Sequence, residues 1–181
     1  DLSIVNPKLK REEDATALES LRWLIREARA YNTTISLHIN MVDAFEESPL
    51  WDTYIKNDII ARDANGNLKS IWEYVKGHKA YHLSYTKEWE KGFAKPRIDH
   101  LIDMIPELKD GHTIHIDAFM AYWQPENRPL SPWHAKPENG GIDIYKEVET
   151  QRKIFKYWRE KGFDVTGEGI FWAHPAKSEA K

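Results

Sequence analysis

The sequence predicts an α/β fold, a partial (β/α)8 barrel of the TIM type with parallel strands and crossover helices. Predicted helices and strands alternate along the chain, an order that favours a parallel sheet. Each predicted strand has one apolar and one polar face, whereas strands of a doubly wound sheet are usually apolar on both. The chain has 181 residues, and a complete barrel takes about 250. We therefore expect one domain over residues 1–181, a fragment of a larger catalytic domain.

Three helices are predicted from apolar residues that recur at helical spacing. The first covers the stretch around residues 18–28 and stops near Asn32. The second begins with Pro96 at its first position, a favoured place for proline. The third runs from about 142 to 161, and Gly162 follows it where a glycine often ends a helix.

Four strands are predicted, and the side chains of the first alternate between apolar and polar. The strands cover residues 33–40, 80–85, 113–119 and 163–168. The segment 41–67 is expected to be a long loop with short helical turns, and the segment 120–141 is expected to be a long connection rich in Pro, Trp and polar residues. A loop of that length inside a compact domain is usually functional or lid-like. Four strands cannot close a barrel, so we expect a missing remainder of the barrel as a partner.

Composition excludes several classes of protein. Hydrophobic residues make up 41% of the chain, and 26 basic residues are balanced by 29 acidic ones. These values argue against a disordered chain and against a protein that tracks nucleic-acid phosphates. There is no cysteine, hence no disulfide framework, and no apolar stretch approaches the length of a membrane span. The compartment is not fixed by the sequence, although a secreted or cell-surface bacterial location is favoured.

Two carboxylates occupy matched positions in the predicted barrel. Asp117 and Glu168 each lie near the carboxyl end of a strand, and active sites of barrel enzymes form at those ends. Neighbouring parallel strands are about 4.8 Å apart, so both groups could reach one glycosidic bond. Glycoside hydrolysis needs such a pair, with one carboxylate ionised and the other protonated. The competing interpretation is an ordinary ion pair or a capping aspartate.

Polar and aromatic side chains near these carboxylates are candidate sugar ligands. His38 and Asn40 end the first predicted strand on its polar face. The chain has eight Trp residues, most of which are expected to fill the core. Trp123 and Trp172 are the best candidates for contact with a sugar, since each follows a candidate catalytic residue within a few positions.

A metal site is the competing chemistry. His115 and Asp117 share a strand face, and His38 and His174 could converge with them, as in metal-dependent barrel hydrolases. The His-x-His pair typical of such barrels is absent, so His115 is interpreted as an interior hydrogen-bonding residue. No cofactor is required for the predicted chemistry. A structural calcium ion is left open by the segment 63–67, which is interpreted as a turn because the later glutamate of a calcium loop is missing.

Several short motifs together resemble one family of glycoside hydrolases. They are Ser36-Leu37-His38-Ile39-Asn40 with Asp43, then Tyr85-Thr86, then His115-Ile116-Asp117, then Glu168. This pattern is similar to the barrel core of endo-α-N-acetylgalactosaminidases and related α-N-acetylgalactosaminidases, which remove GalNAc-containing O-glycans from Ser and Thr of glycoproteins.

The resemblance implies a retaining reaction with specific roles. Asp117 would be the nucleophile and Glu168 the general acid/base. His38, Asn40 and Asp43 would shape the sugar subsite. The expected partner is therefore a carbohydrate or glycoprotein substrate, with no nucleic acid. The alternative functions are a non-catalytic carbohydrate-binding or scaffold fragment and a metal-dependent barrel hydrolase.

Overall fold

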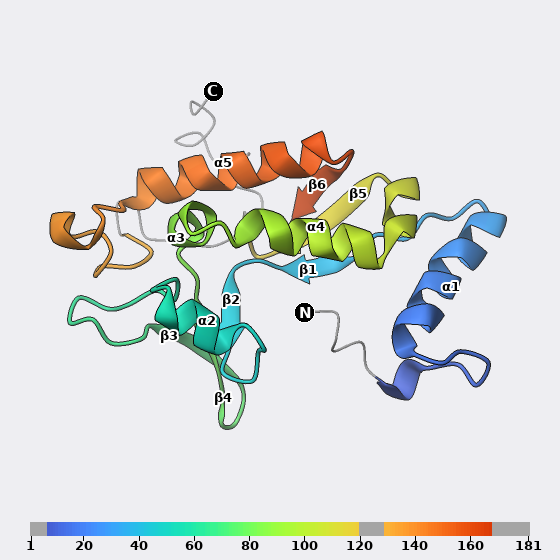
Figure 1. Cartoon of the computed structure of the whole chain (residues 1–181), viewed down its shortest axis with the longest axis horizontal. Coiled ribbons are helices and arrows are strands. Elements are labelled where there is room, and N and C mark those ends of the chain that lie inside the picture. The colour runs from blue at the N-terminus through green and yellow to red at the C-terminus, as the bar shows by residue number, and fades with distance from the viewer. Residues whose placement is uncertain (1–6, 120–128, 168–181) are drawn as a thin grey trace.

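The computed structural model of the chain describes residues 7–119 and 129–167 and contains two small β-sheets with separate hydrophobic cores. Figure 1 shows the first sheet beside the long helices and the second sheet below it. The elements are η2 (Pro7–Leu9), α1 (Ala17–Ala30), β1 (His38–Asn40), β2 (Asp43–Phe45), α2 (Trp51–Lys56), β3 (Ser70–Val75), β4 (His78–His82), α3 (Tyr85–Glu90), α4 (Ala94–Met104), η3 (Pro106–Asp110), β5 (Thr113–Asp117), η4 (Pro137–Asn139), α5 (Ile144–Glu160) and β6 (Asp164–Gly167).

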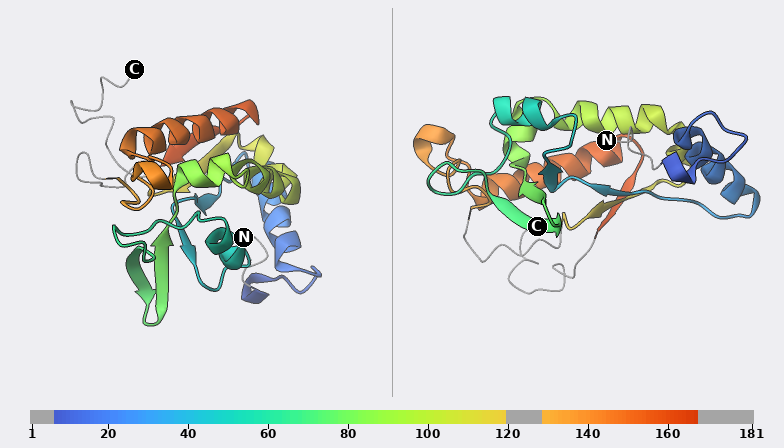
Figure 2. Two further views of the ribbon diagram at one scale, coloured as in Figure 1. Left: turned by 60° about the vertical axis from the view of Figure 1, so that its left-hand side comes forward. Right: turned by 90° about the horizontal axis from the view of Figure 1, so that it is seen from below.

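The first sheet is parallel and has the order β1-β5-β6. Helices α4 and α5 lie along one side of it, as the views in Figures 1 and 2 show. Their buried side chains pack with the buried face of β5, Ile114 and Ile116, and Trp158 of α5 is 1% exposed. The mixed α/β class with a parallel sheet and crossover helices is thus confirmed for these three strands.

The opposite face of the parallel sheet is polar. Burial alternates along β5, so His115 and Asp117 are only partly covered while Ile114 and Ile116 are buried. In β1, His38 and Asn40 are exposed on either side of the partly buried Ile39. The predicted division of each strand into an apolar and a polar face is therefore found in the structure.

The second sheet was not predicted. It is antiparallel with the order β2-β4-β3. The segment 80–85 was expected to be a strand of the parallel sheet. Its first residues belong instead to β4, which forms an antiparallel hairpin with β3, so that prediction is wrong. The hairpin turn lies at Gly77, whose φ of 91° suits glycine. The expectation for 41–67 is also wrong in part, since the segment contains the strand β2, whereas the short helix α2 agrees with the expected helical turns.

One helix boundary differs from the prediction, and another confirms it. Helix α4 begins at Ala94, so Pro96 is its third residue, not its first. Proline is tolerated there because N–H groups in the first turn have no carbonyl partner within the helix. Gly162, after α5, has a φ of 93° and its N–H bonds to the Arg159 carbonyl oxygen, which confirms the predicted helix end.

Helix α1 begins with a capping box. The Thr16 hydroxyl accepts a hydrogen bond from the Glu19 backbone N–H at 3.2 Å, and the Glu19 carboxylate accepts one from the Thr16 N–H at 3.1 Å. Replacing Thr16 by Ala removes half of this reciprocal pair. We expect the free energy of unfolding to fall by about 1 kcal/mol, measured by urea denaturation. The same change at the exposed Thr34, after the helix, should have a much smaller effect.

Candidate functional site

The register of the β1–β5 pair places four polar side chains side by side. His38 lies opposite His115, and Asn40 lies opposite Asp117. All four are on the face of the sheet away from helices α4 and α5. The structure therefore brings together the site residues predicted on these two strands, at the carboxyl ends of parallel strands.

Asp117 is the carboxylate at the centre of this group. Its side chain is 25% exposed, and its Oδ1 lies 3.5 Å from Nε2 of His38. The imidazole rings of His38 and His115 lie against each other, with centroids 4.8 Å apart and planes at 30°. Asp117 is thus open to a ligand on one side and flanked by an imidazole on the other.

His115 extends the polar group to the third strand. Its Nδ1 lies 3.0 Å from the hydroxyl of Thr166 on β6, and Thr166 is exposed on the same face. Sequence reasoning missed Thr166, although the alternation along residues 164–167 could have pointed to it. His115, predicted as an interior hydrogen-bonding residue, thus contacts Thr166 on the polar face of the sheet.

Asn40 has a positioning role at the end of β1. Its Oδ1 accepts hydrogen bonds from the backbone N–H groups of Val42 at 2.8 Å and of Asp43 at 3.2 Å. An asparagine side chain that bonds the backbone two residues ahead stabilises a turn. This turn carries the chain out of the parallel sheet and into β2, and it holds Asp43 next to the end of β1.

Asp43 is the second carboxyl group of the site and is 8% exposed. Its Oδ2 accepts a hydrogen bond from the indole N–H of Trp72 on β3 at 3.1 Å. Burial raises the pKa of Asp43, and repulsion by Asp117 adds to that effect. The two aspartates therefore occupy unequal environments, one open and one enclosed.

The sequence predicts that most of the Trp residues fill the core, yet 51% of Trp72 is exposed. Its indole edge is fixed by Asp43 while much of the ring remains open to solvent. A half-exposed aromatic ring beside a carboxyl group is a suitable surface for the C–H face of a sugar. The sequence feature that could have identified Trp72 is its position in a short pattern typical of a strand, the segment that forms β3.

The remaining predicted site residues lie outside the described residues. These are Glu168, Trp123, Trp172 and, from the metal alternative, His174. Their roles stay predictions. Within residues 7–119 and 129–167, no three His, Asp or Glu side chains are grouped in a way that could hold a metal ion.

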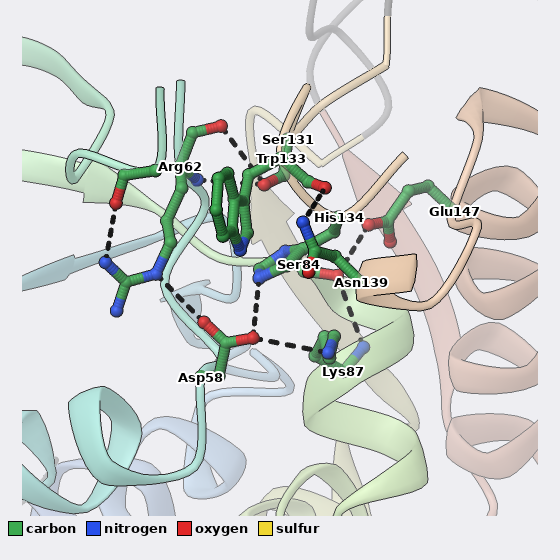
Figure 3. A network of polar contacts seen from close by, with 10 residues as sticks. Asp58, Arg62, Ser84, Lys87, Ser131, Trp133, His134, Asn139 and Glu147 are labelled. Atoms are coloured by element: carbon green, nitrogen blue, oxygen red, sulfur yellow. Dashed lines mark hydrogen bonds and ion pairs between the residues drawn. The ribbon is translucent and has the colours of Figure 1, made fainter. Parts of the chain in front are cut away.

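A second polar group, the Asp58 cluster, consists of Asp58, Arg62, Lys87 and His134 (Figure 3). The Asp58 carboxylate lies 3.1 Å from Nε2 of His134, 2.9 Å from Nε of Arg62 and 3.3 Å from Nζ of Lys87. His134 is completely buried and belongs to the connection between β5 and α5. The cluster therefore joins that connection to the segment that follows α2.

Further contacts hold the same connection. The hydroxyl of Ser131 accepts a hydrogen bond from the Arg62 N–H at 2.8 Å, and Lys69 donates to the Leu130 carbonyl oxygen at 2.8 Å. Trp133 covers Gly66 so closely that an added Cβ would lie 3.1 Å from its ring. Residues 130–134 are thus anchored on the segment between α2 and β3.

The Asp58 cluster predicts how stability responds to acid. Partial burial acts to raise the pKa of Asp58, but His134, Arg62 and Lys87 outweigh it, so the pKa lies below its ordinary value. The ionised Asp58 carboxylate therefore stabilises the fold. This contribution to stability is complete above the ordinary aspartate pKa of about 4, and it is lost as pH falls through the lower pKa that Asp58 has in the folded state. We expect Asp58→Asn to be less stable than the parent at neutral pH, with a difference that shrinks below about pH 4 in thermal denaturation. The exposed Asp103→Asn is the control and should show no such trend.

A carboxyl group at the end of a parallel strand, Asp117, with imidazole and amide groups beside it, is a feature of the kind that glycoside hydrolases use. This chain belongs to the endo-alpha-N-acetylgalactosaminidase family, whose family model matches residues 10–166. The match places it among glycoside hydrolases of GalNAc-type O-glycans. Comparisons with curated proteins and with solved structures found no match. In the part of the chain that the structure describes, no helix is long and apolar enough to span a membrane.

Proposed function

We propose that the chain is part of the catalytic domain of a retaining glycoside hydrolase that releases α-linked GalNAc-type glycans from Ser or Thr. Asp117 is the nucleophile and Glu168 the general acid/base. The observation that carries the proposal is the position of Asp117. It lies at the carboxyl end of β5, partly exposed, with His38 beside it and Asn40 opposite it in the sheet. The family match supports the class of substrate.

The reaction proceeds in two displacements. An oxygen of Asp117 attacks the anomeric carbon while Glu168 gives its proton to the glycosidic oxygen, and the bond to the Ser or Thr oxygen breaks. Glu168, now ionised, takes a proton from water, and the resulting hydroxide attacks the same carbon and releases Asp117. Two inversions leave the product in the α configuration of the substrate.

The side chains around Asp117 supply substrate contacts. His38, Asn40, His115 and Asp43 offer donors and acceptors for sugar hydroxyl and acetamido groups, and the open face of Trp72 offers a stacking surface. Trp123 and Trp172, which follow Asp117 and Glu168 in the sequence, are further candidates for contact with the sugar. Polar groups that fix orientation combined with an aromatic surface are the usual composition of a small-molecule site.

We also propose that β1, β5 and β6 are consecutive strands of a (β/α)8 barrel, of which residues 1–181 form a fragment. Their parallel order, the helices on one face and the polar side chains on the other support this assignment. The polar face would then line the barrel interior. The antiparallel sheet is an insertion between β1 and β5.

The configuration of the first product and the site of covalent attachment test the mechanism together. With an aryl α-GalNAc substrate, proton NMR should detect α-GalNAc before mutarotation. A 5-fluoro analogue that slows the second step should leave one sugar mass on the peptide containing Asp117. Initial β-GalNAc, or an adduct on another residue, would contradict the assignment. Saturable sugar binding without any turnover would support the non-catalytic carbohydrate-binding alternative.

A further inference from the structure

Asp43 lies at the junction between the two sheets. On one side its backbone N–H bonds to the Asn40 side chain, and Asn40 is paired with Asp117 across the parallel sheet. On the other side β2 pairs with β4, which puts Asp43 opposite His82. Asp43 is 8% exposed and His82 is completely buried. A carboxyl group is therefore enclosed between the candidate nucleophile and the second sheet.

The hydrogen bonds of this carboxyl group are unequal. Oδ2 accepts the indole N–H of Trp72 at 3.1 Å. Oδ1 is buried and has no hydrogen-bond partner within residues 7–119 and 129–167. An ionised carboxylate with one buried oxygen left unsatisfied is strongly disfavoured. Because an indole can only donate, a proton on this carboxyl group would have to be on Oδ1.

The surrounding groups also favour the neutral form. Burial raises the pKa of Asp43 and repulsion by Asp117 acts in the same direction, while the bonds from Asn40 and Trp72 only partly oppose it. Burial, with a smaller contribution from Lys69, lowers the pKa of His82 to about 3, so His82 is neutral at physiological pH. The ammonium group of Lys69 itself is directed to the Leu130 carbonyl oxygen.

We infer that Asp43 works as a neutral carboxylic acid with its proton on Oδ1, a positioning residue that holds the Trp72 indole beside Asp117. The inference rests on the proposed function only in taking Asp117 as the nucleophile. Ionisation of Asp43 would bury a second negative charge next to Asp117. That charge would repel Asp117 and would change the contact with the Trp72 indole, whose N–H binds a carboxylate more strongly than a neutral acid, so the site would fail on the alkaline side of the Asp43 pKa.

The first test does not require activity. A raised carboxyl pKa means that the folded state binds the proton more tightly than the unfolded state, so stability falls as pH rises through the folded pKa. Asp43→Asn keeps the shape and an acceptor for Trp72 but cannot ionise. In thermal denaturation it should be more stable than the parent at pH 8, and its advantage should disappear towards pH 4. The exposed Asp103→Asn on α4 is the matched control.

An Asp43→Asn protein that is less stable than the parent at pH 8, or that does not fold, would overturn the inference. Infrared spectroscopy of the parent gives a second measurement. A protonated-carboxyl band should persist above the pH at which exposed aspartates ionise, and it should be absent from Asp43→Asn. In Trp72→Phe the midpoint of this band should move to higher pH, since the lost N–H donor favoured the ionised form. A parent without the band would also overturn the inference.

The positioning role is tested by pH profiles. Fluorescence of Trp72, taken as the difference between the parent and Trp72→Phe, should change across the carboxyl transition and remain constant in the Asp43→Asn background. The alkaline fall of kcat/KM should follow the same midpoint and should be absent from Asp43→Asn. A Trp72 signal that does not respond to this transition contradicts the positioning role. If the infrared band and the Trp72 fluorescence change as expected but the protein has no turnover, the result contradicts the proposed function and not the role of Asp43.

Discussion

Asp117→Asn is expected to lower kcat by a factor on the order of 10⁴ or more. The amide has the same size as the carboxylate but is neither anionic nor nucleophilic, so the first displacement cannot occur. The fold should remain intact, because Asp117 is on the open face of the sheet and contacts the exposed His38. The measurement is steady-state hydrolysis of an aryl α-GalNAc substrate, with the melting temperature recorded for the same sample.

Two controls separate loss of the nucleophile from loss of structure. Asp103→Asn removes one exposed carboxylate from α4 and should retain parental kcat. In Asp117→Gly the vacated space should admit azide, and azide attack on the anomeric carbon should restore turnover and give a β-glycosyl azide. An Asp117→Asn protein with parental kcat would disprove the catalytic assignment.

Arg97→Met is expected to lower the free energy of unfolding by about 3–5 kcal/mol. Glu88 of α3 is completely buried, and its carboxylate lies 3.1 Å from Arg97 of α4 and accepts the Tyr54 hydroxyl at 2.5 Å. Removal of Arg97 leaves the buried negative charge without its cation, and a buried unpaired charge is far less favourable than a buried pair. Urea denaturation of the variant measures the loss.

The double variant Arg97→Met/Glu88→Gln provides the comparison. It removes the cation and the buried charge together, so it should recover much of the stability lost in Arg97→Met. Lys95→Met, two positions earlier on the first turn of α4, is the surface control and should lower stability much less, since the exposed Lys95 loses only its contacts with the rings of Trp89 and Tyr157. Equal losses in the single and double variants would show that the packing of Arg97, not its charge, is responsible.

Periodicity predicted the elements that belong to the parallel unit. The stripe of α1, the alternation of β1 and β5 and the Gly162 stop all depend on local spacing, which the sequence contains in full. The second sheet was missed although β3 and β4 form a tight hairpin. Strand β2 has only three residues, and its pairing with β4 joins segments distant in sequence, so residues 80–85 were assigned to the wrong sheet.

The site residues that could be predicted are those with polar side chains at the carboxyl ends of predicted strands. His38, Asn40, His115 and Asp117 follow from alternation on strands whose carboxyl ends meet. Trp72 and Thr166 were not predicted, since their relation to Asp43 and His115 depends on tertiary contacts. The roles of Asp43 and Asn40 became distinct only with the structure, in which Asn40 forms the turn that encloses Asp43.

The pairing of β1 with β5 has a consequence for the order of folding. Ser36 and Thr113, bonded across this pair, are 77 positions apart, whereas β3 and β4 are joined by a tight hairpin. Closing a long loop costs chain entropy before any contact compensates for it, so distant pairings form slowly. We expect the hairpin and its core to form early, and the sheet that carries Asp117 to assemble last. During refolding, catalytic activity would then be recovered only in the final kinetic phase.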